Sequence, residues 1–407
     1  MKFKGWQMVY TGMMMEFSVI GFVFYCFPLM FSVLERDLGA SQSQLSGALS
    51  LWFIGSAVGS IFLGRLLDRY SVKRIMIIGG IIFSLGLFSI SFIEDSLSLL
   101  LIYATLLAVG GPALGNLSVT KLVANWFESK AGVALGIAAI GISFSGVVLP
   151  ILVDPLIDSI GWRNVYLVFG AVVIFILIPS VRYLVIDTPE EIGQYKDNLQ
   201  QPIDDGLSKA LMSLKDFLRA KIFWLISLAF AFQFLAMGGV LLHLPLHSEN
   251  QGFLETWLIF GFPLKQTVFA YSLAALGGVI GKIFFGYLID RLQPNQPVML
   301  MMLMQAVGIF GLTMIDQLGL FLIFCLIFGI GFGGAMVLMS ACFLKAFGSN
   351  NLGSVRGLSA LIIVPVQPVG MFVVGRAFDL NLYIEAFLLM GAITLLGFII
   401  GSRIIIR

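Results

Sequence analysis

The amino-acid sequence predicts an all-α membrane protein whose twelve transmembrane helices form two pseudo-symmetric six-helix bundles. Three observations predict this fold class: an apolar composition, twelve apolar runs of spanning length, and a repeat between the two halves. Apolar residues make up 59% of the chain and charged residues 11%, against about 45–50% and about 25% in soluble domains. A soluble protein of 407 residues could not bury so much apolar surface, so we expect lipid to cover its outside.

Each predicted helix is an apolar run close to the length of about 20 residues that a membrane span needs. The runs are 8–33, 45–67, 75–93, 98–125, 131–153, 164–186, 222–246, 267–289, 297–315, 318–344, 356–375 and 383–402. With the N-terminus inside, the inside segments carry 17 Lys and Arg residues and the outside segments carry 4. This bias places both termini in the cytoplasm. We therefore expect an integral multi-pass protein of a bacterial cytoplasmic (inner) membrane, whose first run is retained as a span rather than cleaved as a signal peptide.

One long polar stretch, 187–221, divides the twelve runs six and six. It mixes proline and glycine with charged residues, which is typical of a linker. We expect an N-terminal six-helix bundle at 1–186, a cytoplasmic linker at 187–221 and a C-terminal six-helix bundle at 222–407. Within the linker, 207–219 could form a short amphipathic helix at the membrane surface. The other long connection is 248–266.

A repeat links the second and eighth runs. Residues 59–70 (GSIFLGRLLDRY) and residues 281–292 (GKIFFGYLIDRL) are identical at seven of twelve aligned positions. The shared polar pattern consists of Gly64, Asp68 and Arg69 in one copy and Gly286, Asp290 and Arg291 in the other. Two duplicated halves of the same orientation place a substrate site between them, near the bilayer midplane, and rock around it. A structural scaffold needs no movable halves, so the architecture predicts a secondary transporter.

The stretch from Gly64 to Arg74, GRLLDRYSVKR, resembles the signature between the second and third helices of the major facilitator superfamily. The resemblance covers essentially the whole chain and implies the twelve-helix transporter fold. It also implies a cytoplasmic gate, in which the glycine lets helices 2 and 11 pack closely and Asp68 acts with the basic Arg69 and Arg74 as a latch. A carboxylate near a helix N-terminus is favoured by the unpaired amides there. Ser71 stands where the family usually has glycine, and serine tolerates a tight turn less well.

Two further stretches narrow the resemblance. Residues 125–146 (NWFESKAGVALGIAAIGISFSG) and 161–166 (GWRNVY) resemble the branch of monocarboxylate porters and oxalate:formate antiporters. Gly132, Gly136 and Gly141 match the glycine pattern of that branch. We interpret these glycines as packing positions that let the fifth helix approach a neighbour closely, as small residues do in membranes.

Lys282 is the leading candidate for binding a substrate. It lies eight residues before Asp290, which is about 12 Å inward from the cytoplasmic end of its helix. An ionisable group at that depth costs a few kcal/mol or more, so it is a functional candidate by default. In the resembled branch, an arginine four residues before the signature glycine pairs with the substrate carboxylate, and Lys282 stands at that position before Gly286. The alternative is a lysine that snorkels to the inner headgroups.

Two other ionisable groups lie within predicted helices. Glu16 either carries a coupled proton or pairs with Lys121 or Lys282. The branch often carries a second cationic anchor after a proline of helix 1 or in helix 11, but Pro28 precedes a leucine and the run 356–375 lacks such a lysine. Lys121 either substitutes for that anchor or snorkels. A single anchor suits a monoanion better than a dicarboxylate.

Neutral side chains complete the predicted cavity. Helices 1, 4, 7 and 10 line the cavity in the resembled family, so Tyr25, Asn116 and Gln233 are better candidates for contacting substrate than Gln305. The sequence does not fix the helix face that each occupies.

No metal or cofactor site is predicted. His243 and His247 share one helix face at the outer end of their run, but no Cys or further His is placed to complete a metal site. We interpret them as interfacial polar residues beside Pro245, with proton sensing as the alternative. The glycine-rich segment 329–334 lies inside a predicted helix with no preceding strand, so it is not a nucleotide loop. We expect no enzymatic activity and no nucleic-acid partner.

The leading hypothesis is a secondary active transporter that moves a small organic anion, a monocarboxylate, by alternating access. Proton symport and anion exchange both remain open as coupling modes, and a monomer suffices for this architecture. The alternative is a proton-coupled exporter of drugs or hydrophobic compounds, which Glu16 and the 37 phenylalanines keep open. A third hypothesis is a membrane receptor or sensor, which would carry no solute flux.

Overall fold

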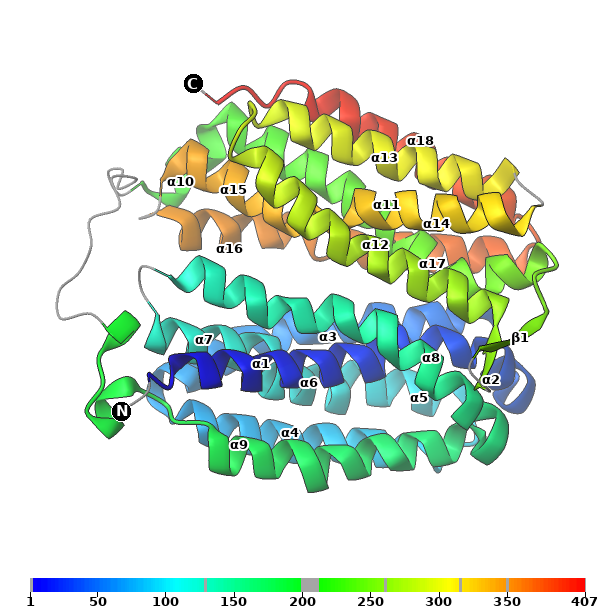
Figure 1. The fold of residues 1–407 in the computed structure, drawn as a ribbon, viewed down its shortest axis with the longest axis horizontal. Coiled ribbons are helices and arrows are strands. Elements are labelled where there is room, and N and C mark those ends of the chain that lie inside the picture. The colour runs from blue at the N-terminus through cyan, green and yellow to red at the C-terminus, as the bar shows by residue number, and fades with distance from the viewer. Residues whose placement is uncertain are drawn as a thin grey trace. The chain divides into compact units, whose positions relative to one another are not determined.

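The computed structural model of the chain describes residues 3–127, 130–198, 212–259, 262–314, 317–348 and 351–406. Helices make up almost all of its regular structure (Figure 1), as predicted. Ten helical stretches of the described chain are long and apolar enough to cross a membrane. The longest, Val133–Leu184, has 52 residues and breaks at Gly161, where φ is 78°. A further helix, α3 (Gln42–Arg69), has 28 residues and is about 42 Å long. The described chain thus shows ten such stretches, one of them broken at Gly161, and the count of twelve spans stays a prediction.

The chain divides into two compact units. The first comprises residues up to Ala40 and Leu51–Asp204, and the second comprises Ser41–Ser50 and Asp205–Arg407. The beginning of α3 is thus grouped with the second unit, while the rest of this helix belongs to the first. The sequence did not predict this grouping.

The first unit is built from helices that follow the predicted apolar runs. They are α1 (Gly5–Ile20), η1 (Gly21–Tyr25), η2 (Phe27–Met30), α2 (Phe31–Leu38), most of α3, α4 (Val72–Ile90), α5 (Ser96–Ile102), η3 (Tyr103–Leu107), α6 (Ala108–Leu114), α7 (Asn116–Trp126), α8 (Ala131–Val172), η4 (Val173–Leu177), α9 (Ile178–Leu184), η5 (Pro189–Ile192) and η6 (Lys196–Asn198). Asp95 caps α5 by accepting hydrogen bonds from the Ser98 hydroxyl at 2.7 Å and the Ser98 backbone N–H at 2.8 Å. These hydrogen bonds lower the pKa of the Asp95 carboxyl.

Glycines decide how closely α1 and α8 approach. A Cβ at Gly141 of α8 would collide with the backbone carbonyl of Met13 in α1. Small residues at such positions let membrane helices pack backbone to backbone, so the predicted packing role is confirmed at Gly141. At Gly136 no described atom of a neighbouring helix of the first unit lies within 4 Å of the position that a Cβ would take, so the packing role stays a prediction there. The surroundings of Gly132 lie outside what the structure describes.

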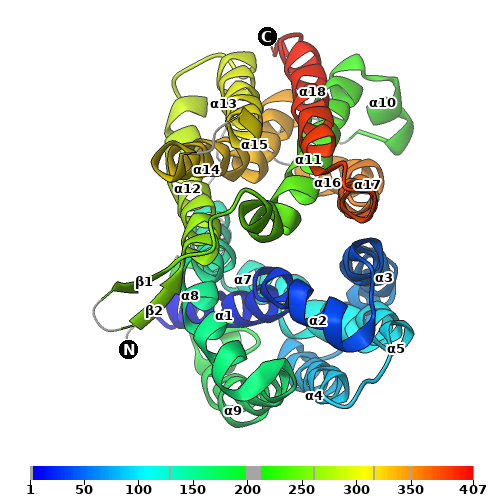
Figure 2. The same cartoon turned by 90° about the vertical axis from the view of Figure 1, so that its right-hand side faces the viewer.

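The second unit holds the beginning of α3 and the remaining elements. They are α10 (Leu214–Arg219), α11 (Lys221–Asn250), β1 (Thr256–Ile259), β2 (Phe262–Lys265), α12 (Gln266–Ile289), α13 (Asn295–Met314), α14 (Leu318–Gly333), α15 (Ala335–Phe347), α16 (Leu352–Ile363), α17 (Val366–Asp379) and α18 (Tyr383–Gly401). Figure 2 looks along the helices and shows α12, α13 and α14 grouped together within this unit. Strands β1 and β2 form an antiparallel hairpin in the long connection 248–266, which the sequence did not predict.

The glycine-rich segment 329–334 is a packing surface. It runs through the end of α14, as the sequence predicts, and its Gly329 and Gly333 face α12, whereas Gly331 faces α13. A Cβ at Gly329 would collide with the carbonyl of Ala274, and one at Gly333 would collide with the carbonyl of Gly278. Close approach of the two backbones therefore requires these glycines.

The described part of the linker contains the short helix α10. Its start is a capping box in which the Asp216 carboxylate accepts from the hydroxyl of Ser213 at 2.7 Å and from the N–H of Ser213 at 2.8 Å. These hydrogen bonds lower the pKa of the Asp216 carboxyl. Of the helix predicted over 207–219, the residues from Leu214 on are helical, and 207–211 lie outside the described residues.

Candidate functional site

Glu16 lies on α1 and is buried within the first unit, with 3% of its surface exposed. One turn before it, a Cβ at Gly12 would lie 2.6 Å from Val119 of α7. One turn after it, Val19 lies 3.4 Å from the Cβ position of Gly115, the residue before α7. Glu16 is rotated by roughly 40° from Gly12, so it lies on the side of α1 that faces α7, between these two contacts. A carboxyl at such a place must be protonated or paired.

Asn116 and Lys121 lie on α7. Asn116 is the first residue of this helix and is exposed, whereas Lys121 is half-buried. Lys121 is rotated by roughly 160° from Val119, so it lies on the side of α7 that faces away from α1. One turn further along that side, Asn125 donates a hydrogen bond from Nδ2 to the backbone carbonyl of Asp187 at 3.0 Å. The Cα of Lys121 therefore lies off the face by which α7 meets α1, and its pairing with Glu16 stays a prediction.

Tyr25 is buried at the end of η1, a single π-helical turn that continues α1. Its ring packs on α8, where a Cβ at Gly146 would lie 2.6 Å from Cδ1 of the ring. Phe24 contacts the same ring edge to face, with 5.2 Å between the ring centroids. Single π-helical turns are frequent at functional sites, and here the turn directs the tyrosine against α8.

Gln233 of α11 is completely buried and bonds to Gln305 of α13. Gln233 Nε2 donates to Gln305 Oε1 at 2.9 Å, and Gln305 Nε2 donates to the backbone carbonyl of Gln233 at 3.2 Å. The structure thus joins two glutamines that the sequence analysis treated separately. This geometry is that of a helix-packing pair, and a role for Gln233 in substrate binding stays a prediction.

Lys282 is half-buried on α12. The same helix carries an exposed apolar stripe of Leu276, Ile280, Ile283 and Tyr287, which are 40%, 41%, 70% and 54% exposed. Such a stripe is what a lipid-facing surface requires. Lys282 is rotated by roughly 130° from the middle of this stripe, so its backbone position points away from the lipid-facing side. A lysine that only snorkels along lipid would be expected on the stripe itself.

The first copy of the signature lies at the end of α3. Gly64 belongs to the first unit and the run 356–375, on which it is expected to pack, belongs to the second, so this close packing stays a prediction. Ser71 has a φ of −55° and accepts a hydrogen bond from the N–H of Arg74 at 3.3 Å, so it caps the N-terminus of α4. The turn needs no positive φ, which is why serine replaces glycine without strain. Arg69 is exposed, and the side chain of Asp68 lies outside the described residues.

The second copy lies at the end of α12. The heavy atom nearest to the Cβ position of Gly286 is Cγ1 of Val337, at 3.7 Å. Asp290 is the exposed C-cap of the helix. The guanidinium of Arg291 lies over the ring of Tyr287, 3.9 Å from its centroid, which is a cation–π contact worth about 0.5–1 kcal/mol at an exposed site.

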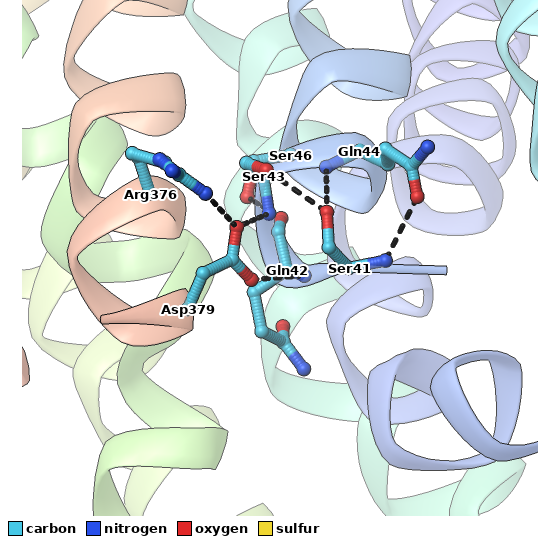
Figure 3. Close-up of polar contacts among 7 residues, drawn as sticks. All are labelled: Ser41, Gln42, Ser43, Gln44, Ser46, Arg376 and Asp379. Atoms are coloured by element: carbon cyan, nitrogen blue, oxygen red, sulfur yellow. Dashed lines mark hydrogen bonds and ion pairs between the residues drawn. The ribbon is translucent and has the colours of Figure 1, made fainter. Parts of the chain in front are cut away.

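A polar cluster at the start of α3 was missed by the sequence analysis (Figure 3). Asp379, the last residue of α17, accepts hydrogen bonds from the backbone N–H of Gln42 at 2.8 Å and of Ser43 at 3.2 Å. We call this arrangement the Asp379 cap. All of its residues belong to the second unit. The only local signal was the sequence from Ser41 to Gln44, which fits a capping box and predicts the start of a helix but not its distant partner.

His243 and His247 were interpreted as interfacial polar residues, but both are completely buried. Nε2 of His243 lies 2.8 Å from Oγ of Ser46 in α3, and Nδ1 lies 2.9 Å from the carbonyl of Gly239. Nε2 of His247 lies 2.9 Å from the carbonyl of Leu312 in α13. The two imidazoles therefore have separate partners on different helices. Within the described ranges, no three His, Cys, Asp or Glu residues are grouped as a metal site would require.

Comparison with known proteins identifies related transporters. The family model described as Major Facilitator Superfamily matches residues 14–364. The MFS-type transporter pynF of Aspergillus niger is 25% identical over 341 residues, which are 83% of this chain and 73% of that protein. The uncharacterized MFS-type transporter YhjX of Escherichia coli is 22% identical over 339 residues, 82% of this chain and 79% of that protein. Monocarboxylate transporter 6 of Mus musculus is 25% identical over 202 residues, 48% of this chain and 42% of that protein.

A solved structure shares the fold. It is a bacterial homolog of the human lysosomal transporter Spinster in an inward-facing and occupied conformation, with a TM-score of 0.71 and 14% sequence identity. The match covers 98% of this chain and 94% of that chain. The family match over most of the chain and the apolar helices together show an integral multi-pass membrane transporter. The chain therefore belongs to the major facilitator superfamily.

Proposed function

We propose that this transporter moves a small organic anion, a monocarboxylate, by alternating access, with proton symport or anion exchange as the coupling mode. The observation that carries the proposal is Lys282, a half-buried cation on α12 that lies away from the exposed apolar stripe of that helix. Ionisable groups within membrane helices mark substrate and ion pathways, and a cation there is suited to bind an anion. A lysine ammonium binds a carboxylate as a point charge, without the bidentate fork of an arginine.

The choice of a monoanion follows from the number of cations. We propose Lys282 as the single anchor, because the chain lacks the second lysine that the resembled branch carries after a proline of helix 1 or in helix 11. One anchor neutralises one carboxylate. The similarity to a monocarboxylate transporter over 48% of this chain supports the same substrate class.

Glu16 is the proposed coupling residue. Its carboxyl is buried on the side of α1 that faces α7, where gaining or losing a proton changes the local charge strongly. Tyr25 and Asn116 would supply neutral hydrogen bonds to the substrate, as would Gln233 if it leaves its partner. The two signature copies would gate the cytoplasmic side, and both termini would face the cytoplasm of a bacterial cell.

A proton-coupled exporter of hydrophobic compounds is the second candidate function. The observation that favours it is the burial of Glu16 among apolar helices, because an acidic group in an apolar cavity also suits a cationic or neutral hydrophobic substrate. Such an exporter would not depend on Lys282.

A substrate panel in proteoliposomes tests the proposal. The purified protein is reconstituted, and uptake of labelled mono- and dicarboxylates is measured with and without a proton gradient, beside efflux of hydrophobic dyes. We expect saturable uptake of a monocarboxylate that excess unlabelled monocarboxylate inhibits. Dye movement driven by the proton gradient, with no carboxylate uptake by the same folded protein, would instead establish the exporter.

A further inference from the structure

We propose that Asp379 is a positioning residue of the transport cycle, whose carboxylate holds the first turn of α3 against α17 in the state seen here and releases it in the other state. This inference rests on transport by alternating access. The Asp379 cap lies at the end of α3 that the predicted orientation places outside the cell.

The Asp379 cap satisfies half of the free donors at the start of α3. The first N–H groups of a helix have no partner within the helix. Here Ser41 and Gln44 bond to each other, through Ser41 N–H to Gln44 Oε1 at 2.9 Å and Gln44 N–H to Ser41 Oγ at 3.2 Å. The remaining two donors, the N–H groups of Gln42 and Ser43, bond to Asp379 (Figure 3). The helix start therefore depends on a side chain 337 positions away from Gln42.

The charge of Asp379 acts mainly on the helix rather than on its basic neighbour. The side chain of Asp379 is 11% exposed, and its carboxylate meets the positive end of the α3 macrodipole. Hydrogen bonds to a charged acceptor are stronger than neutral ones. Arg376 Nη1 lies 3.7 Å from Oδ2 of Asp379, but the arginine side chain is 58% exposed, and exposed ion pairs contribute little.

The cap continues as a polar seam along one face of α3. Gln42, Ser46 and Ser50 follow each other at intervals of four residues, so they share that face. Ser46 lies 2.8 Å from Nε2 of His243, and Ser50 Oγ donates to the carbonyl of Pro368 at 3.0 Å. Polar bonds of this kind can be exchanged for water when the seam opens, which an apolar core cannot do without a large loss of stability.

A glycine lets α17 approach this seam. A Cβ at Gly375 would lie 2.9 Å from the carbonyl oxygen of Gln42 and 3.0 Å from Cβ of Ser46, and would collide with Oγ of Ser46. An added methyl group must therefore push α17 away from the start of α3. Gly375→Ala thus perturbs the same seam as a loss of the Asp379 charge, by an independent route.

Helix α3 passes from one unit to the other, and the polar seam lies at that passage. From Leu51 onward, α3 belongs to the first unit, whereas Ser41–Ser50 belong to the second. Movement of one unit against the other must either bend α3 at this point or separate its first turns from α17. A continuous helix resists bending through its backbone hydrogen bonds, so the side-chain seam gives way first.

A cysteine reporter tests this inference. Gln42→Cys replaces a side chain that is 4% exposed and keeps the backbone N–H that the cap uses. Its reaction with a membrane-impermeant maleimide is measured in the proteoliposome-embedded protein, alone and combined with Asp379→Asn or Gly375→Ala. Loss of a charged acceptor should raise the labelling rate by about tenfold or more, and Gly375→Ala should change it in the same direction. Arg376→Gln should raise the rate by less than about threefold.

Two controls separate release of the seam from general loosening. Glu385→Gln removes another acidic group, in the first turn of α18, and should leave the rate unchanged. The native Cys325 is completely buried in α14 and should stay unlabelled in every variant. Labelling of Cys325 together with the reporter thiol would mean that the variants are merely unfolded, which would overturn the inference. Equal labelling rates of the Gln42→Cys reporter with and without Asp379→Asn would overturn it as well.

The reporter needs no substrate, so its outcome is independent of the proposed function. Faster labelling in a protein that carries no carboxylate would support the Asp379 cap as a releasable contact and refute the proposed substrate class. Saturable carboxylate uptake with unchanged labelling would support the proposed function and refute the role of Asp379.

Discussion

Replacing Gln233 and Gln305 singly and together by leucine tests whether Gln233 serves helix packing or substrate binding. The two side chains share two hydrogen bonds, at 2.9 Å and 3.2 Å, in a completely buried position between α11 and α13. Each single change removes one partner and leaves the other buried. The double change removes both and fills the space with apolar side chains of similar size.

The structure predicts unequal costs for the two single changes. Gln305→Leu removes both hydrogen bonds and leaves Nε2 of Gln233 unsatisfied, at a cost of about 1–3 kcal/mol in the free energy of unfolding. Gln233→Leu removes one hydrogen bond, and it also removes Oε1 of Gln233, a buried oxygen that has no partner among the described residues. It leaves Oε1 of Gln305 without its donor, but it orphans fewer polar atoms than Gln305→Leu, so its cost should lie toward the lower end of the same range of about 1–3 kcal/mol. The double variant should cost less than the sum, by a coupling energy of about 0.6–1.7 kcal/mol.

Unfolding by denaturant in mixed micelles measures this double-mutant cycle, and carboxylate uptake is measured on the same four proteins. If the pair serves packing, the double variant should lose less stability than the two single changes together and should retain uptake. If the cost of the double change equals the sum of the two single costs to within about 0.3 kcal/mol, the two glutamines are not coupled and the reasoning is refuted. A stable double variant that has lost uptake would return Gln233 to the substrate site.

Two further changes test local packing and capping. Gly329→Ala should destabilise the protein by about 1–3 kcal/mol, because its methyl group collides with the Ala274 carbonyl. Gly319→Ala in the same helix is the control: its methyl group meets no described atom of a neighbouring element within 4 Å, so the change should be neutral or slightly stabilising. Equal melting temperatures of the two variants would contradict this difference. Ser71→Ala should cost about 0.5–2 kcal/mol through loss of the α4 cap, and Ser71→Gly only a few tenths. A Ser71→Gly variant more stable than the parent would show that the turn prefers glycine after all.

The helices were predictable because a membrane span is a local property of the sequence. A run of about 20 apolar residues leaves the backbone no option except a helix. The irregularities within the runs were harder to predict. The run 98–125 is divided into α5, η3, α6 and α7, with Pro112 inside α6 and a break at Gly115. The hairpin at 256–265 was missed because two strands of four residues carry little pattern of their own.

The sequence predicts the candidate site as a set of residue types, and the role of each residue in transport stays a prediction. Burial of Glu16 and partial burial of Lys282 agree with the rule that ionisable groups in membrane helices face the protein interior. The face of each helix was not fixed by the sequence, so the bond between Gln233 and Gln305 was unforeseen. The Asp379 cap was also missed, since it joins Gln42 to a residue 337 positions away and no local pattern contains such a pairing.

The central claim is that Lys282 anchors the carboxylate of a transported monoanion. Saturable uptake of the preferred monocarboxylate in proteoliposomes, measured for the parent, Lys282→Gln, Lys282→Arg and the exposed control Lys221→Gln, tests it most directly. We expect Lys282→Gln to lose saturable uptake while remaining folded, Lys282→Arg to keep a part of it because the charge is retained, and Lys221→Gln to match the parent. Full uptake by Lys282→Gln, together with loss of transport in Glu16→Gln, would contradict the anion carrier and favour the proton-coupled exporter.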